Sequence, residues 1–344
     1  RYSLPAGDGV TTPYQIGSAE QLAWFADKIT NGTGSTKLDV ELTAYIDLGG
    51  DAYVDSGNLP WIPIGYNLSG SVLKETIRTY GGIFDGGGYM IDRMYTKARG
   101  NVGLFAYAGE GAVIKNVGIG PRSWVESTGN DNTSDNSATA AIVAMGYSKQ
   151  AWVTANASAV PLTIEGCYSR ATVKGNTDAN TGGIFGSDVV LYRWDNTYRK
   201  GKIAGCYVAG PVSSATGSGY AIAGWITASK TDGGGIYNCY WDNNILSSQA
   251  VCNGPTTAYA VNCSGKTTAE MKAEAIITLL NTSITEKNWI YNNTATSKVN
   301  DGYPILKTQN LITTWAGVAA LGLPAPTVQS PSSEASTFGT EDNP

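Results

Sequence analysis

The apolar positions of residues 80–119 fall into short segments separated by glycine. Four such segments occupy residues 83–84, 89–91, 102–105 and 113–119. Segments this short, rich in β-branched and aromatic residues and bounded by turn residues, are typical of strands rather than helices. Asp85 and Gly86 predict a tight turn after the first segment, because aspartate hydrogen-bonds its own backbone and glycine takes positive φ at no steric cost.

Two short phrases of sequence recur along the chain. The first begins with isoleucine and occupies residues 114–119, 164–169, 203–208 and 236–241. The second is small and apolar and occupies residues 102–105, 140–143, 182–186 and 223–226. Two interleaved phrases at irregular spacing indicate a solenoid with loops of unequal length inserted between its coils. We therefore predict an all-β protein, a parallel β-helix (β-solenoid), and we expect it to be right-handed.

The second phrase contains a pattern known from a protein family. Gly183-Ile184-Phe185-Gly186 fits the GLUG pattern (glycine, leucine, any residue, glycine) closely, whereas residues 103–106 lack the last glycine. The chain therefore resembles the GLUG-repeat proteins of bacterial surfaces, of the filamentous-haemagglutinin-like and immunoglobulin-protease-like kinds. The resemblance runs from about Ile16 to about Leu306, because residues 16–22 and 301–306 look like the usual flanks. It implies a β-solenoid fold and no single activity, since such repeats serve as scaffold in proteins of different function.

The beginning of the chain predicts a cap on the solenoid. Residues 18–30 predict a helix, because Ser18 and Gln21 can form a capping box and an apolar stripe follows them. Residues 40–48 then alternate between apolar and polar positions as a strand does. A solenoid must cover its open end. We therefore assign residues 1–50 to an N-terminal cap.

The rest of the chain divides into coils, a second cap and a tail. We assign residues 51–265 to the coils. Residues 267–280 predict a helix capped by Thr267 and Glu270, with an apolar stripe of Met271, Ala275, Ile276, Leu279 and Leu280. Together with the segment up to residue 323 this helix is expected to close the far end. Residues 324–344 are too rich in proline and polar residues to bury a core, and predict a linker or an assembly strand.

Composition and charge exclude or disfavour several classes of function. The net charge of −5 and the pI near 4.9 disfavour a nucleic-acid partner, since phosphate binding needs clustered Lys and Arg. No apolar run approaches the roughly 20 residues of a membrane helix, so we expect no membrane insertion. These 344 residues contain no histidine, which excludes imidazole mechanisms, including the zinc-protease site of some proteins that carry this repeat. The start at Arg1 leads us to expect a processed or excised part of a secreted or cell-surface protein.

The five cysteines predict two structural roles. Cys167, Cys206 and Cys239 occupy the same position of the first phrase, so stacked coils would place them above one another as an interior ladder of free thiols. The alternative is a metal site, which neither a CxxC spacing nor a histidine favours, and we predict none. Cys252 and Cys263 bracket a loop outside the repeat. We predict a disulfide between them, which would suit an oxidising compartment.

The strongest candidate for ligand binding is the loop at residues 191–200. Its aromatic rings could stack on a sugar while neighbouring polar groups bind the hydroxyls, and the same rings suit a protein interface. The alternative is that Trp194 packs the loop onto its own solenoid. The predicted binding residues are Tyr192, Arg193, Trp194, Asp195 and Tyr198.

A second polar loop is a weaker candidate. Asp131 and Asp135 lie in a run rich in asparagine that could offer oxygen ligands to calcium. The run lacks the glycine and distal glutamate of a recognised calcium loop. We therefore favour a solvated turn and predict no cofactor, with calcium at these two aspartates as the alternative.

Carboxylate pairs could support catalysis without histidine, as they do in glycosidases. Asp85, Asp92 and Glu110 are close in sequence, but no pattern places two of them on one face, so we predict no catalytic residue. We expect a non-catalytic structural and adhesive β-solenoid whose partner is a glycan, a host surface protein or copies of itself. The alternative is a carbohydrate-active enzyme of β-helix fold, either a glycoside hydrolase or a polysaccharide lyase.

Overall fold

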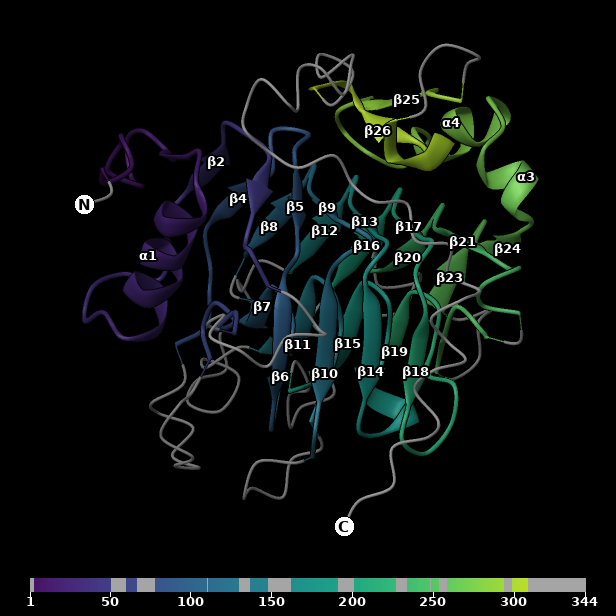
Figure 1. Cartoon of the computed structure of the whole chain (residues 1–344), viewed down its shortest axis with the longest axis horizontal. Helices are drawn as coiled ribbons and strands as arrows, with labels where there is room; N and C mark the ends of the chain where they lie inside the picture. The colour runs from purple at the N-terminus through teal and green to yellow at the C-terminus, as the bar shows by residue number, and fades with distance from the viewer. Residues whose placement is uncertain are drawn as a thin grey trace.

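A computed structural model gives the fold of this chain. It describes residues 3–50, 60–66, 78–109, 111–129, 137–147, 162–190, 201–226, 234–247, 249–253, 259–293 and 299–308. Within these residues the strands form four parallel sheets, called A to D, and one short antiparallel pair (Figure 1).

Each parallel sheet is a stack of strands from successive coils, and neighbours in a stack are hydrogen-bonded. In spatial order, sheet A consists of β1 (Tyr14–Ile16), β2 (Val40–Leu42), β4 (Ile83–Asp85), β8 (Val113–Lys115), β12 (Thr163–Glu165), β16 (Lys202–Ala204), β20 (Gly235–Tyr237) and β23 (Ala260–Val261). Sheet B consists of β3 (Ile46–Asp47), β5 (Met90–Asp92), β9 (Gly118–Ile119), β13 (Tyr168–Ser169), β17 (Tyr207–Val208), β21 (Tyr240–Asp242) and β24 (Ser264–Lys266). Sheet C consists of β7 (Phe105–Ala108), β11 (Val143–Tyr147), β15 (Phe185–Val190), β19 (Ala223–Trp225) and β22 (Cys252–Asn253). Sheet D consists of β6 (Tyr95–Ala98), β10 (Trp124–Ser127), β14 (Thr172–Gly175) and β18 (Val212–Ser214).

Along the chain, a coil passes through sheets A, B, D and C before it returns to sheet A. Successive coils pair in register: Ile164 of β12 lies opposite Ile114 on one side and Ile203 on the other. The prediction of a parallel β-helix is therefore confirmed. The hand of the coil stays a prediction.

The first recurring phrase forms the corner between sheets A and B. Its third residue takes positive φ in successive coils: Asn116 (54°), Gly166 (61°), Gly205 (56°) and Asn238 (50°). Asn262 (53°), at the equivalent position of the next coil, does the same. This left-handed conformation is open to glycine at no cost and to asparagine at little cost. The alternation of Gly and Asn at this position is thus required by the turn of the chain.

The second phrase needs its glycines because neighbouring coils approach each other closely. A Cβ on Gly183 would lie 2.5 Å from the carbonyl oxygen of Ala221, and one on Gly186 would lie 2.4 Å from that of Ala144. Phe185 pairs with Ala223 in the next coil. Because Gly182 likewise pairs with Tyr220, the fourth copy of the phrase lies at residues 220–224, and the copy predicted at residues 223–226 begins three residues too late.

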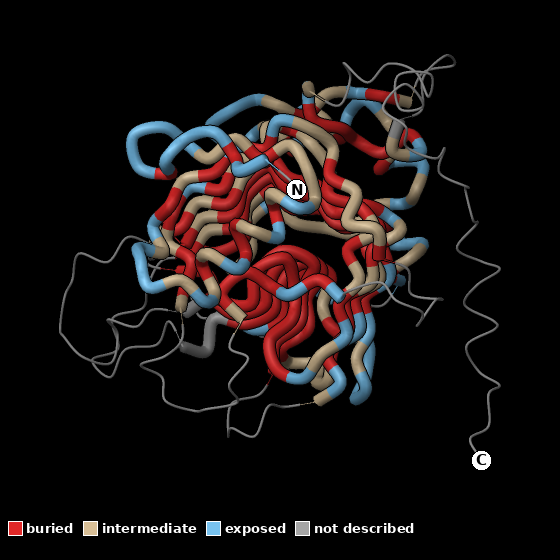
Figure 2. The backbone as a smooth tube through the Cα atoms, turned by 60° about the vertical axis from the view of Figure 1, so that its left-hand side comes forward, coloured by how far each residue is buried: buried red, intermediate tan, exposed pale blue. Residues whose placement is uncertain are grey.

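The interior of the coils is filled by apolar side chains. Figure 2, which colours the backbone by burial, shows buried residues in red repeating from coil to coil. Ile164 of sheet A and Phe185 of sheet C, for example, face the same internal gap. Such layers of equivalent residues are what a solenoid stacks to build a continuous core.

Helix α1 (Ala19–Thr30) lies at the N-terminal end of the stack (Figure 1). The Ser18 hydroxyl accepts a hydrogen bond from the N–H of Gln21, which is one half of the predicted capping box. The Gln21 side chain accepts from the N–H of Gly17 and not from that of Ser18. The buried residues of the helix are Leu22, Phe25, Ala26 and Ile29. The single strand predicted at residues 40–48 is instead the pair β2 and β3, because the chain turns there from sheet A into sheet B.

The predicted helix at residues 267–280 is two helices, α3 (Thr268–Met271) and α4 (Ala275–Leu280). Met271 and Ile276 are both buried, and a spacing of five residues does not place two side chains on one face of a continuous helix. The break lets both of them face the solenoid. Leu279, predicted in the apolar stripe, is exposed.

The remaining short elements follow α4 or lie between coils. They are β25 (Trp289–Ile290) and β26 (Ile305–Leu306), which pair antiparallel, and the 3₁₀ turns η3 (Asp178–Asn180) and η5 (Val299–Gly302). None of the helices in the described residues has the length and apolarity that a membrane span requires.

Residues 276–293 and 299–306, together called the C-terminal segment, lie along the side of the solenoid (Figure 1). Tyr168 and Tyr207 point outward from sheet B and are stacked, with ring centroids 5.1 Å apart. Trp289 packs on both rings. The C-terminal segment therefore covers the outer face of sheet B, because this row of tyrosines offers it an apolar surface. The predicted closing of the far end of the coils stays a prediction.

Candidate functional site

Seven residues singled out by their sequence pattern lie outside the described residues. They are the predicted binding residues Tyr192, Arg193, Trp194, Asp195 and Tyr198 and the predicted calcium ligands Asp131 and Asp135. Their roles stay predictions.

Cys167, Cys206 and Cys239 lie in the interior, one coil after another, and all three are fully buried. The thiol of Cys206 donates to the carbonyl oxygen of Ala204 at 3.3 Å. Burial raises the pKa of the Cys167 and Cys239 thiols. Cys167 and Cys239 are therefore protonated, apolar core groups near neutral pH.

The predicted disulfide between Cys252 and Cys263 is wrong. Cys263 follows the corner residue Asn262, and its sulfur accepts a hydrogen bond from the N–H of Cys239 at 3.4 Å. It thus extends the interior ladder by one coil. Cys252 lies in β22 of sheet C, opposite Ala223. The two cysteines lie on different sides of the solenoid and do not form a disulfide. The inference of an oxidising compartment, which depended on that disulfide, therefore loses its basis.

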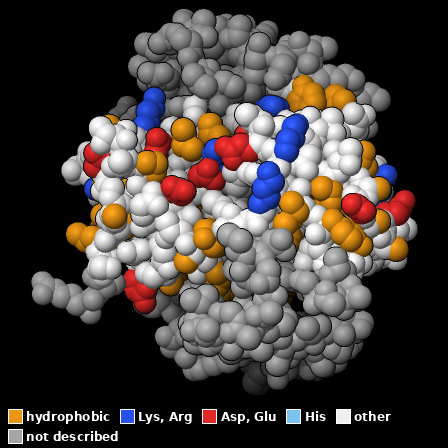
Figure 3. All heavy atoms as spheres, turned by 90° about the horizontal axis from the view of Figure 1, so that it is seen from above, with side chains coloured by type: hydrophobic (Ala, Val, Ile, Leu, Met, Phe, Trp, Pro, Cys, Tyr) orange, Lys and Arg blue, Asp and Glu red, His pale blue; other side chains and the backbone are white. Residues whose placement is uncertain are grey.

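Asp85 belongs to a polar cluster at the corner of sheets A and B. The Lys115 ammonium lies 3.0 Å from Oδ2 of Asp85 and 2.5 Å from Oε1 of Glu286. The side-chain amide of Asn116 donates to Oε2 of Glu286 at 3.0 Å. The hydrogen bond from Lys115 holds the pKa of Glu286 below its usual range. Figure 3 shows acidic and basic side chains side by side on the upper face of the molecule.

Asp92 is held at a different corner, where sheet B leads to sheet D. Arg122 Nε donates to its Oδ2 at 2.8 Å, and the Arg122 main-chain N–H donates to its Oδ1 at 3.0 Å. Tyr45 also donates to Oδ2, at 3.3 Å, and burial followed by the charge of Asp92 raises the pKa of Tyr45. Only 3% of the Asp92 side chain is exposed. Asp85 and Asp92 are thus separate, charge-paired groups, and Glu110 lies outside the described residues.

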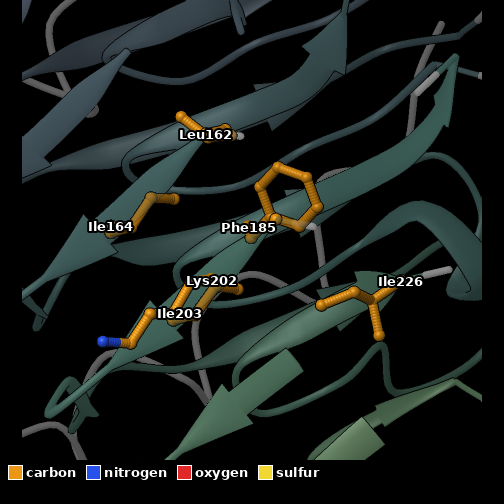
Figure 4. A pocket seen from close by; sticks show the side chains of 7 residues that line it. Leu162, Ile164, Phe185, Lys202, Ile203 and Ile226 are labelled. Carbon is orange, nitrogen blue, oxygen red and sulfur yellow. The ribbon is translucent and has the colours of Figure 1, made fainter. Parts of the chain in front are cut away.

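An internal gap lies between sheets A and C (Figure 4). Its volume is about 10 Å³, which is close to the space of one water molecule. Apolar side chains line it, and the Lys202 ammonium points away from Phe185 and Ile226 (Figure 4). The gap cannot hold a substrate. Among the described residues, no three His, Cys, Asp or Glu side chains are grouped so that they could hold a metal ion.

A larger hollow, of about 300 Å³, lies beside the C-terminal end of α1. Asp8, Tyr14, Lys28 and the loop at residues 32–35 line it. None of these residues was a sequence-based candidate. The available signal was weak: Trp24 and Lys28 are one helical turn apart, and a glycine-rich loop follows them.

Comparisons with known proteins place few limits on function. No protein-family model matches the chain, and no curated protein matches it. It is similar to a crystal structure from Bacteroides ovatus described as that of a putative immunoglobulin A1 protease, with 19% identity, a TM-score of 0.46, and coverage of 87% of this chain and 93% of that chain. A likeness at this level bears on neither activity nor ligand, and the GLUG resemblance stays a prediction.

Proposed function

We propose that this chain is a non-catalytic structural and adhesive module of a secreted or cell-surface protein. The proposal rests on the ion pairs and hydrogen bonds that Asp85 and Asp92 already make within the chain. Each is committed to a cation and to backbone or side-chain donors from another part of the chain. A general acid or base must exchange a proton at a reacting group, and a carboxylate held in this way is occupied by its structural partners.

The ion pairs join segments that are distant in sequence. Glu286 of the C-terminal segment is 171 residues from Lys115, and Asp92 is 30 residues from Arg122. Together with the in-register sheets, these links favour a stiff rod with a filled interior. Such a structure suits a spacer that presents contact surfaces. We propose that the partner bound by these surfaces is a glycan, a host surface protein or another copy of this chain.

Self-association would use an end of the solenoid or the tail at residues 324–344. Helix α1 lies at the near end, whereas β23 and β24 are the last described strands of sheets A and B. Strands at the end of a sheet present unpaired backbone groups that can accept another strand. We expect no resident cofactor for either form of the module.

The proposal is tested by enzyme assays and a glycan array on the full chain. We expect no release of reducing sugar or unsaturated uronate from a polysaccharide panel, no cleavage of immunoglobulin A, and binding to a subset of glycans. Turnover that Asp85→Asn or Asp92→Asn abolishes, with the fold intact by circular dichroism, would overturn the proposal in favour of a carbohydrate-active enzyme.

A further inference from the structure

One aromatic residue, Tyr14, lines the hollow beside α1, and Trp24 packs against it. Tyr14 of β1 and Trp24 of α1 pack edge to face, with ring centroids 5.2 Å apart and ring planes at 81°. Gly9 makes room for the Tyr14 ring, since a Cβ there would lie 2.6 Å from Tyr14 Cε2. An aromatic face of this kind can stack on the C–H face of a sugar ring.

A lysine without a carboxylate partner among the described residues stands beside these rings. The Lys28 ammonium lies 5.3 Å from the centroid of the Trp24 ring and 5.9 Å from that of Tyr14. No carboxylate of the described residues lies within 4.0 Å of it. Ring contact attracts the cation but does not neutralise it. The positive charge is therefore available to an anionic ligand.

The acidic residue of the hollow does not compete for Lys28. The Asp8 carboxylate accepts a hydrogen bond from the Thr11 hydroxyl and from the main-chain N–H groups of Val10, Thr11 and Thr12. These bonds, that of the Thr11 hydroxyl first, hold the pKa of Asp8 well below its usual range. Asp8 is thus an ionised, turn-forming group: Oδ1 accepts three main-chain N–H bonds and Oδ2 the Thr11 hydroxyl, and no ion pair joins it to Lys28 among the described residues.

The opposite wall is held in place by Arg78. Its Nε donates to the carbonyl oxygen of Ile29 and its Nη2 to that of Gly34, both at 2.6 Å. These bonds tie the loop at residues 32–35 to the end of α1, so the hollow is formed before any ligand enters. Thr33 and Ser35 line it and bring hydroxyl groups that can bind the hydroxyls of a sugar.

We propose that this hollow binds one carboxylate-bearing sugar residue, a uronic or sialic acid at the end of a glycan. The ring would stack on Tyr14, and the carboxylate would pair with Lys28. A volume of about 300 Å³ is at the lower end of small-molecule sites and suits a single sugar residue. The inference rests on the adhesive form of the proposed function, and it specifies the chemical class of the glycan that the chain would bind.

The test is titration of the full chain with three glycosides, followed by saturation-transfer NMR and calorimetry. The probes are methyl β-glucuronide, methyl α-sialoside and, as the neutral match of the first, methyl β-glucoside. We expect saturable binding of at least one acidic glycoside and weaker binding of the glucoside by about tenfold, the scale of one charge-assisted hydrogen bond. The two acidic probes distinguish a uronic from a sialic acid.

Lys28→Met keeps the aliphatic stem against the rings and removes the charge. We expect this variant to lose the preference for the acidic glycoside while its melting curve stays unchanged. The matched control is Lys37→Met, because Lys37 is exposed nearby but does not line the hollow. No binding of either acidic probe, equal binding of the glucoside, or unchanged acidic preference in Lys28→Met would each overturn the inference. The proposed function would survive these outcomes, because its enzyme assays and glycan array do not depend on this hollow.

Discussion

The indole Nε1 of Trp289 donates a 2.8 Å hydrogen bond to the carbonyl oxygen of Gly205, 84 residues earlier in the chain. Gly205 is the corner residue between sheets A and B of one coil. The indole ring also lies 5.3 Å from the Tyr207 ring and 6.1 Å from the Tyr168 ring. One side chain thus joins the C-terminal segment both to the corner and to the row of tyrosines.

Trp289→Phe should lower the free energy of unfolding by about 1–3 kcal/mol, because it leaves the buried carbonyl of Gly205 without its donor. Urea unfolding followed by circular dichroism measures the change. Tyr291→Phe is the control, since it also removes one hydrogen bond, to the carbonyl of Asn293, but from a side chain that is 37% exposed. An equal loss in both variants would contradict a special role for Trp289.

Asparagine should be tolerated at one glycine corner and not at another. In Gly166→Asn the atom closest to the new Cβ would be Oδ1 of Asn116, at 3.1 Å, and Ile284 Cδ1 would lie at an ordinary contact distance of 3.8 Å. Asparagine already occupies this corner in other coils. In Gly205→Asn the Cβ would lie 2.4 Å from Ile284 Cγ2 and 2.5 Å from the carbonyl oxygen of Leu280.

We therefore expect Gly166→Asn to change the free energy of unfolding by less than about 1 kcal/mol and Gly205→Asn to lower it by about 1–3 kcal/mol. Hydrogen exchange should show the C-terminal segment loosened only in Gly205→Asn. Equal protection of the C-terminal segment from hydrogen exchange in both variants would show that the corner at Gly205 does not hold this segment in place.

The coils could be predicted from sequence because each coil repeats the same local requirements. Ile114 and its equivalents face the interior in register, and the corner after them admits only Gly or Asn without strain. The fourth copy of the second phrase was misplaced because Trp225 and Ile226 resemble Ile184 and Phe185 in side-chain type. Register is set by pairing between coils, and resemblance of residue types alone does not report it.

The side contacts and the candidate site could not be predicted in the same way. Trp289 meets Gly205, and Glu286 meets Lys115, only because the chain folds back along the finished solenoid. The hollow likewise depends on β1 and α1 lying side by side, which brings Tyr14 to Lys28. No local periodicity encodes contacts of this range.

The thiol ladder predicts a specific pattern of alkylation. In denaturant without reductant, Cys263 should react with iodoacetamide, because it is a thiol of the ladder and not half of a disulfide. In the native protein Cys263, which is partly exposed, should react before the fully buried Cys206. Peptide mass mapping measures both. A peptide that links Cys263 to Cys252 would contradict the ladder assignment.

Replacing Cys206 with aspartate tests the interior position more severely. A buried carboxylate without a partner costs several kcal/mol, so Cys206→Asp should fail to fold, whereas Cys206→Ala should fold with a moderate loss of stability. Soluble expression and thermal melting measure the outcome. A Cys206→Asp protein that melts like the parent would place this side chain outside the core.

Acid should weaken the attachment of the C-terminal segment through Glu286. The hydrogen bond from Lys115, followed by those from Asn116 and Asn288, lowers the pKa of Glu286 from its ordinary value of 4.5. A carboxyl whose pKa is lower in the folded state stabilises fully above its ordinary pKa, and this stabilisation is lost as the pH falls through the folded value. Glu286→Gln should thus lower the free energy of unfolding near pH 7, by less than about 1 kcal/mol for a half-exposed pair, and the difference from the parent should shrink as the pH falls below 4.5. Glu274→Gln, an exposed change that flanks α4, should give a small difference that does not depend on pH. A Glu286→Gln difference that persists in acid would mean that Glu286 stabilises the segment by packing and not by charge.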